Sequence, residues 1–290
     1  MINREPVPIR RSRSDRRWPT IIAIVVVAFL LFGRFLATLW TDYLWYQSVG
    51  HAGVWRTLVF TRIGLVVVAS LIAFGLFWGN LWLVDRLSPR RRLPSGTPEE
   101  ELLARFQEWI EPRVGRVRLA ISAFFGIMLG LSGSFWWKEW LQFRNATSFG
   151  TSDPIFHNDL SLYVFKLPFY NVLFGWFFQL ILVIAVVSAS IHYLNGAVEF
   201  SFNRRVEPGV KVHLSVLFAS LALLKAAGYM LNRWELLFSD RGRVFGASYT
   251  DVNAQLPALN LLIAISLVAA IILLLNLRFR GWTLPIVAVS

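Results

Sequence analysis

The chain lacks cysteine altogether and is poor in charge. Cysteine is absent from its 290 residues, and charged residues make up 16% of them, whereas an average soluble domain has about 25%. Without cysteine there can be no disulfide, no thiolate metal site and no cysteine nucleophile. Hydrophobic residues reach 56%, and this composition argues against a water-soluble core.

Long uncharged runs predict helices that cross a membrane. A hydrocarbon core of about 30 Å takes about 20 apolar residues at 1.5 Å each. A seventh apolar segment, residues 282–290, is too short to span, so we expect the natural protein to continue beyond it. The sequence therefore predicts an all-α fold, a polytopic transmembrane helix bundle with six complete spans and the start of a seventh. The six spans are expected at residues 21–39, 63–84, 119–136, 172–194, 212–231 and 257–277, within a bundle that covers residues 18–281.

The net charge of +12 comes mainly from Lys and Arg in the segments that connect the spans. Their distribution between the two sides predicts the topology. Lys and Arg residues in alternate connecting segments number nineteen on the side of the N-terminus and seven on the other side. Cytoplasmic loops carry the excess of positive charge, so we expect a cytoplasmic N-terminus. A nucleic-acid partner is not expected, because basic residues form no single patch or stripe.

Two segments outside the spans carry signals of their own. Residues 1–17 are basic and aperiodic, and we interpret them as a disordered cytoplasmic arm that lies on anionic headgroups or serves as a topology signal. Residues 98–111 begin with a helix-start pattern, with Thr97 as N-cap and Pro98 at the first helical position. Their apolar residues recur at helical spacing, which predicts an amphipathic helix in the inner interface. A docking surface for a cytoplasmic partner is the alternative.

Small residues predict where helices pack closely, because in lipid the approach of backbones drives association. In the third span they repeat every four residues, and the second span has one such pair. We expect both helices to pack closely, on one another or on other helices. The residues concerned are Ser122, Gly126, Gly130 and Ser134 in the third span and Gly75 and Gly79 in the second. Aromatic residues such as Trp176 are expected at the headgroup level of the outer side.

Four charged residues lie in or beside the spans. Lys225 is a functional candidate, because an ionised side chain inside a membrane costs about 2.5 to 3.5 kcal/mol. Tyr229 follows one turn later, so a side chain that snorkels to the surface is the simpler interpretation. Arg34 and Asp42 share one face of the first helix, and Asp42 is the expected counter-ion of Arg62.

Three ordered segments resemble uncharacterised protein family 0182, a group of large bacterial membrane proteins. They are Thr41–Gly50 (TDYLWYQSVG), Asp153–Tyr170 (DPIFHNDLSLYVFKLPFY) and Lys225–Leu262. The resemblance implies seven helices followed by a large extracytoplasmic region, in the bacterial plasma (inner) membrane. It implies no activity, since the family is uncharacterised. The family-like loop residues are Asp153, Pro154, Asp159, Tyr163, Tyr249 and Asp251.

The sequence offers no catalytic or metal-binding pattern. Asp153, His157 and Asp159 fall short of a ligand set and fit turn chemistry better. The other three histidines, at positions 51, 192 and 213, lie on separate segments without helical pairing. Phosphate-loop, dinucleotide and serine-hydrolase motifs are missing, so we assign no catalytic residue, no metal and no cofactor.

Three functions remain in order of preference. We favour a membrane anchor or scaffold for a large extracytoplasmic region, with the lipid bilayer and membrane or extracytoplasmic proteins as partners. A transporter or channel component comes second, because the expected spans hold neither a midplane carboxylate nor an interior proline. A membrane-embedded enzyme comes third.

Overall fold

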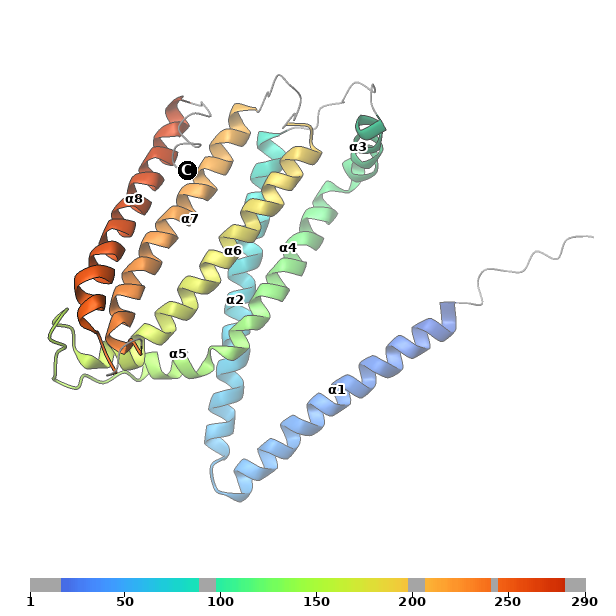
Figure 1. Cartoon of the computed structure of the whole chain (residues 1–290). Coiled ribbons are helices and arrows are strands. Elements are labelled where there is room, and N and C mark those ends of the chain that lie inside the picture. The colour runs from blue at the N-terminus through green and yellow to red at the C-terminus, as the bar shows by residue number, and fades with distance from the viewer. Residues whose placement is uncertain (1–16, 89–97, 198–206, 241–244, 280–290) are drawn as a thin grey trace, which may run out of the picture. The chain divides into compact units, whose positions relative to one another are not determined.

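The computed structural model describes residues 17–88, 98–197, 207–240 and 245–279, and nearly all of them are helical (Figure 1). The expected arm at residues 1–17, apart from Arg17, and the expected start of a seventh span at residues 282–290 lie outside the described residues. The helices form two compact parts, divided between Phe60 and Thr61.

The first part is a helical hairpin. Helix α1 (Arg17–Ser48) is followed by the beginning of α2 (Ala52–Leu87). Gly50 adopts a left-handed backbone conformation with φ of 75°, and the His51 amide donates to the Tyr46 carbonyl at 2.8 Å. This hydrogen bond is the 6→1 bond of a Schellman helix end, which favours glycine at the left-handed position. The turn is closed further by the rings of Tyr43 and Trp55, whose centroids lie 5.1 Å apart.

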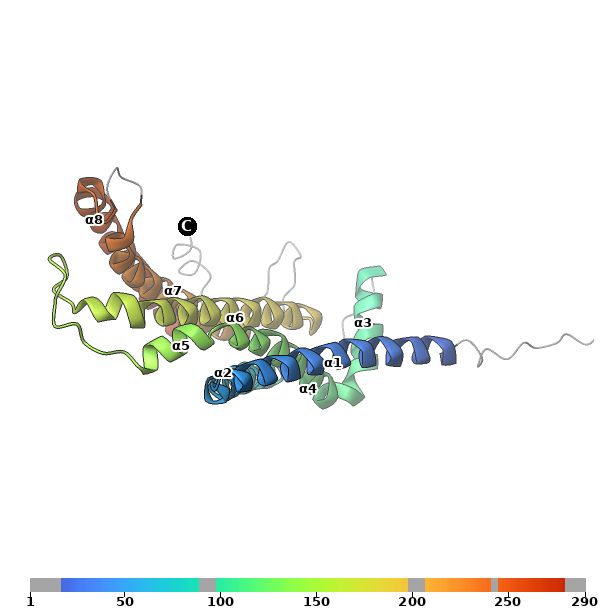
Figure 2. The same cartoon turned by 90° about the horizontal axis from the view of Figure 1, so that it is seen from below.

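The second part begins within α2 and contains the other long helices. Figures 1 and 2 show α6 lying beside α7 and α7 beside α8, while α3 runs across the direction of α4 and α6. We call the end of this part that carries α3 the α3 end, and the opposite end the α5 end. The α-helices are α3 (Pro98–Ile110), α4 (Val114–Gly130), α5 (Trp137–Arg144), α6 (Leu167–Leu194), α7 (Pro208–Glu235) and α8 (Leu256–Phe279).

The prediction of an all-α protein with six long apolar helices is confirmed. Among the described residues, six helical segments are long and apolar enough to cross a membrane. Each overlaps one expected run and is longer than it at one end or both. The segments are Trp18–Ser48, Ala52–Leu87, Gln107–Phe135, Leu162–Leu194, Pro208–Phe238 and Asp251–Leu275.

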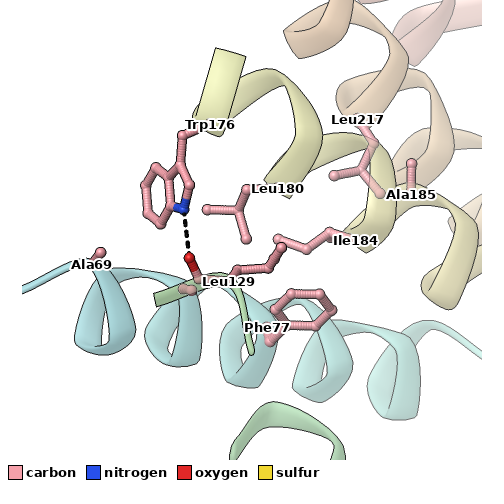
Figure 3. Close-up of a cluster of buried hydrophobic side chains, with 9 residues drawn as sticks. Ala69, Phe77, Leu129, Trp176, Leu180, Ile184, Ala185 and Leu217 are labelled. Atoms are coloured by element: carbon pink, nitrogen blue, oxygen red, sulfur yellow. Dashed lines mark hydrogen bonds between the residues drawn. The ribbon is translucent and has the colours of Figure 1, made fainter. Parts of the chain in front are cut away.

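The core of the second part lies where α2, α4, α6 and α7 meet (Figure 3). Phe77 and Leu180 are fully buried there, and the Trp176 indole N–H donates to the Leu129 carbonyl at 3.0 Å. Trp176 is 5% exposed, so its ring packs against other helices rather than facing outward. Its expected place at the headgroup level stays a prediction.

Glycines of α4 and the following 3₁₀ turn (Leu131–Phe135) bring their backbone against α2. A Cβ atom on Gly130 would lie 2.6 Å from the Ser70 Cα, and one on Gly133 would lie 2.8 Å from the Leu65 carbonyl oxygen. Only glycine fits such an approach. Gly126 faces Phe74 in the same way, whereas Gly75 and Gly79 have open space at the Cβ position. On α2 the contact is therefore formed by Ser70 and Phe74 rather than by the glycines.

Two helices begin with a π-helical turn before a proline. The turns are Leu162–Lys166, ahead of α6, and Asp251–Gln255, ahead of α8. In each the first residue of the α-helix donates its amide five residues back, Leu167 to Leu162 and Leu256 to Asp251. Pro168 and Pro257 come next in the chain. Proline has no amide to donate, and the first turn of a helix is where its absence does least harm.

Candidate functional site

Five polar side chains from α2, α6, α7 and the segments that end α2 and α6 form a continuous hydrogen-bonded chain at the α3 end. The Ser88 hydroxyl lies 2.8 Å from His192 Nδ1, and His192 Nε2 lies 3.0 Å from His213 Nδ1. His213 Nε2 then lies 3.2 Å from Asn80 Oδ1. Asn195 donates to the Ser88 carbonyl at 3.2 Å and to its hydroxyl at 3.3 Å. We call these five residues the histidine chain.

The histidine chain is buried inside the protein. His192 is 0% exposed, Ser88 1% and His213 5%. A buried polar group without a hydrogen bond costs about 1 to 3 kcal/mol, and membrane lipid would supply no partner from outside. The mutual hydrogen bonds therefore decide whether these three helices can pack at all at this end.

Helix ends place the two histidines opposite one another. Helix α6 ends in a second Schellman motif, in which Gly196 has a φ of 74° and the Ala197 amide donates to the His192 carbonyl at 3.1 Å. Helix α7 begins with Pro208 at its first position. His192 thus lies in the last turn of one helix, and His213 in the second turn of its antiparallel neighbour.

The hydrogen bonds have one direction that satisfies every member. The Asn80 amide donates to the Leu76 carbonyl at 2.7 Å, which leaves its oxygen to accept from His213 Nε2–H. Neutral His213 then has a bare Nδ1 that accepts from His192 Nε2–H. His192 in turn has a bare Nδ1 that accepts from the Ser88 hydroxyl. We assign these tautomers from the network, because each imidazole is neutral only with one donor and one acceptor nitrogen.

A cavity of about 120 Å³ adjoins the histidine chain. Asn195 contributes to its wall, which is mostly apolar and is formed by α2, α3, α4 and α6. Two charged groups in the wall pair with one another, since an Arg118 Nη lies 3.3 Å from the Asp85 carboxylate. Arg118 also lies over the Trp78 ring at 4.5 Å. Helix α3 closes this region through Gln107, which donates to the Leu194 carbonyl at 2.8 Å.

At the α5 end, polar groups lie in the loop between α5 and α6. The Asp153 carboxylate is 2% exposed and accepts from the amides of Ile155, Phe156 and Asn158 at 2.9, 2.6 and 2.9 Å. The Tyr163 hydroxyl donates to it at 2.6 Å. Burial opposes ionisation of Asp153, but these hydrogen bonds outweigh burial and hold its pKa below the ordinary value.

Asp159 organises the other half of the same loop. Its carboxylate accepts from the Ser148 hydroxyl and from the amides of Phe149, Gly150 and Ser161. The Ser148 hydroxyl, followed by Ser161 and the Phe149 amide, lowers the pKa of Asp159 strongly. Both carboxylates are thus occupied by loop donors. Among the described residues no group of three or more His, Cys, Asp or Glu side chains could hold a metal ion.

The remaining family-like loop residues lie in turns at the same end. Pro154 opens the turn that Asp153 closes. Asp251 is buried and accepts from the Ser248 amide and hydroxyl at 2.9 and 2.8 Å at the start of the π turn before α8. Tyr249 is 83% exposed. These residues fix the loop backbone rather than converge on one site.

The charged residues singled out in the sequence have different surroundings. Lys225 is exposed on α7, with its ammonium 5.0 Å from the Phe178 ring centroid and 5.8 Å from that of Tyr229. The Arg62 guanidinium lies 5.1 Å from the Trp137 ring centroid. Arg34 and Asp42 are exposed on α1, in the other compact part, so the pairing of Asp42 with Arg62 stays a prediction.

The histidine chain was not predicted from the sequence. His192 and His213 were interpreted as unrelated because no helical spacing joins them. A signal was present in their depth, since His192 lies two residues before the end of one expected span and His213 one residue after the start of the next. Adjacent antiparallel helices bring such positions to the same level.

Comparison with known proteins gives a family but no related structure. The model of an uncharacterised protein family, UPF0182, matches residues 19–290. A UPF0182 protein of Frankia casuarinae is 40% identical over 267 residues, and one of Salinispora tropica is 37% identical over 295 residues. The chain is covered to 92% and 98% in these matches but spans only 26% and 29% of the relatives' length. No solved structure matches it.

Proposed function

Because the chain belongs to the uncharacterised protein family UPF0182, we propose that it is the membrane anchor of a longer protein, with its α3 end in the cytoplasm. It is a multi-pass bacterial membrane protein with six candidate spans. The relatives are about three and a half times as long as this chain, and the proposal is that the bundle holds the further region at the outer surface.

The observation that carries the proposal is how the polar groups inside the bundle are used. Every ring nitrogen of His192 and His213 is engaged by another side chain of the bundle. At the other end, the carboxylates of Asp153 and Asp159 are engaged by loop donors. Polar side chains that hydrogen-bond to one another inside the protein stabilise its packing and are not free to bind a substrate. This favours a rigid anchor over a transport path.

The orientation can be tested by labelling with an impermeant thiol reagent in intact cells. The absence of cysteine from the sequence means that each single-cysteine variant reports on one position only. Thr147→Cys and Tyr249→Cys at the α5 end are expected to be labelled, and Glu111→Cys and Arg116→Cys at the α3 end to be shielded until the cells are lysed. All four positions are exposed on the protein. Labelling of the α3-end pair in intact cells would reverse the orientation.

The anchoring role can be tested on a full-length relative such as the Frankia casuarinae protein. A specific protease site is inserted after the region that matches this chain, and the protease is added to spheroplasts. We expect release of a soluble, folded downstream region, while the bundle stays in the membrane. A downstream region that remains membrane-bound after complete cleavage would contradict a purely anchoring bundle.

One observation supports a transporter component as a second candidate. Lys225 lies in the interior of the α7 span with aromatic rings beside its ammonium, and intramembrane lysines commonly mark ion or substrate paths. Lys225→Met should leave folding intact under either role. A change in ion flux through reconstituted full-length protein, with unchanged thermal stability, would favour transport over anchoring.

A further inference from the structure

We propose that the histidine chain is a proton-binding site that takes up one proton, and only one, at the α3 end. The proposal is independent of the anchoring role, since a bundle of either function could carry it. It rests on the hydrogen-bond inventory of Ser88, His192 and His213 and on an alternative acceptor beside them.

The alternative acceptor is the carbonyl oxygen of Val84, one helical turn before Ser88. The Ser88 hydroxyl lies 3.0 Å from it and 2.8 Å from His192 Nδ1. A serine hydroxyl has one proton to donate and can rotate to suit. Ser88 can therefore exchange one acceptor for the other by turning its O–H bond, without movement of any heavy atom.

This rotation lets His192 accept a proton without loss of a hydrogen bond. The proton, taken from water, bonds to His192 Nδ1 and makes the ring an imidazolium. The new Nδ1–H donates to the Ser88 oxygen, and the hydroxyl proton of Ser88 turns to Val84. His192 Nε2–H still donates to His213, and His213 still donates to Asn80. Every donor in the chain keeps an acceptor.

A second proton is excluded by the same geometry. It would have to bond to His213 Nδ1, which lies 3.0 Å from His192 Nε2. Two N–H groups would then point at one another, and two positive rings would lie in contact in a buried site. Like charges at this distance prevent the second ionisation.

Space for water adjoins the histidine chain, and several charged groups lie around it. The adjoining cavity is roomy enough for a few water molecules, since each occupies about 30 Å³ in the liquid, and Asn195 connects its wall to Ser88. Asp85 on α2 and Arg118 on α4 neutralise one another across this cavity. The other titratable or charged side chains described at this end are Arg86 on α2, Tyr193 on α6, Glu207 and Lys211 at the start of α7, and Glu101, Arg105, Glu108, Glu111, Arg113 and Arg116 from α3 to the beginning of α4. Arg86 lies over the Trp82 ring at 4.0 Å.

Nitrogen NMR of ¹⁵N-histidine-labelled protein in lipid nanodiscs tests the proposal. The chain has four histidines, so His51→Gln together with His157→Asn leaves only the pair. Asparagine suits position 157, where φ is 59°. We expect two bare ring nitrogens at high pH and one at low pH in the folded protein. Two bare nitrogens down to the pH of unfolding, or none in a folded protein, would overturn the proposal.

Two buried serines provide a matched pair of variants. Ser88→Ala removes the hydroxyl that accepts from the imidazolium, and hydrogen bonds to charged groups are about twice as strong as neutral ones. We expect proton affinity about tenfold lower, about one unit of pH. Ser188→Ala, on α6 and equally buried but outside the chain, should titrate like the parent protein. Equal titration of all three proteins would refute the hydroxyl exchange. If the alanine variant does not fold, Ser88→Cys takes its place, since a thiol is only a weak acceptor.

Discussion

The buried polar group at the α5 end is the carboxylate of Asp153, whereas at the α3 end it is the imidazole of His192. Asp153 is ionised and accepts from three backbone amides and one side chain. His192 is neutral in its assigned tautomer and bonds only to the side chains of Ser88 and His213.

The difference comes from the backbone around each group. In the loop at the α5 end, amides are not used by a helix, so they can gather around an anion. Inside a helix the amides are already bonded four residues back, and a buried side chain there must find other side chains. The α5 end is therefore held within one loop, while the α3 end ties three helices together.

The largest effect is expected from a change in the close contact between α4 and α2. Gly130→Leu places a branched side chain where α4 meets α2, with its Cβ 2.6 Å from the Ser70 Cα. We expect the free energy of unfolding to fall by about 3 kcal/mol or more. Thermal unfolding in nanodiscs, followed by tryptophan fluorescence, measures it. Gly75→Leu is the matched control, since its Cβ would meet open space, and equal losses in both variants would remove the claimed contact.

Asp153→Ala should break the α5 end alone. Its removal leaves three partly buried amides and the buried Tyr163 hydroxyl without their acceptor, and we expect a loss of about 3 kcal/mol in the free energy of unfolding. Limited proteolysis should then cut the loop between α5 and α6 faster, while the histidine signals of the α3 end stay as in the parent protein. Faster cleavage together with altered histidine signals would mean that the two ends are not independent.

Acid should loosen the α5 end in a milder way. The folded-state pKa of Asp153 lies below its ordinary value of 3.8, so its contribution is fully present above that pH and is lost as pH falls through the folded value. Loop proteolysis by an acid-active protease should accelerate below about pH 4. In Asp153→Asn this dependence should be weaker, and an unchanged acid response there would assign the effect to Asp159 instead.

A double-mutant cycle sharpens the comparison at the α3 end. Ser88→Ala and His192→Leu remove two partners of one hydrogen bond, so their effects on unfolding should be coupled by about 1 kcal/mol. Ser88→Ala combined with Asp153→Ala should instead be additive within about 0.5 kcal/mol, because the sites lie at opposite ends. A coupling energy of similar size in both cycles would contradict the claim that the two ends are stabilised independently.

The smallest effect is expected at the surface of α3. Arg105 and Glu101 form an ion pair at 2.7 Å, but their side chains are 73% and 59% exposed. Glu101→Ala should therefore change stability by less than about 0.5 kcal/mol. Gln107→Ala, on the same helix, removes the hydrogen bond to the Leu194 carbonyl and should cost about 1 kcal/mol. A larger effect of Glu101 than of Gln107 would show that α3 is not held by its buried face.

The six candidate spans could be predicted because an apolar run of spanning length is a strong and local signal. The neighbours of each helix could not. A helix such as α2 is apolar toward lipid and toward protein alike, so periodicity does not tell which face packs. Gly130 was identified from its spacing, but its contact on Ser70 was not, since Ser70 belongs to no small-residue repeat.

The positions of His192 and His213 along their spans indicate a similar level, but the contact of His192 with Ser88 could not be predicted, for the same reason. Ser88 and His192 are 104 positions apart, and their contact depends on the rotation of α2 and α6 about their own axes. The loop around Asp153 was easier, because Asp-Pro and Asn-Asp are local turn signals. These turn signals do not predict how many backbone amides donate hydrogen bonds to each carboxylate.

The π turns ahead of α6 and α8 bear on how this protein tolerates changes in length. A π turn holds one residue more than an α turn does, and in both cases it stands before the proline, at the beginning of the candidate span. Deletion of one residue inside Leu162–Lys166 can be accommodated if the π turn becomes an α turn. The same deletion within α6 would rotate everything after it by about 100°, and His192 would turn away from Ser88. In related chains, insertions and deletions should therefore occur more often at these two π turns than within α6 and α8.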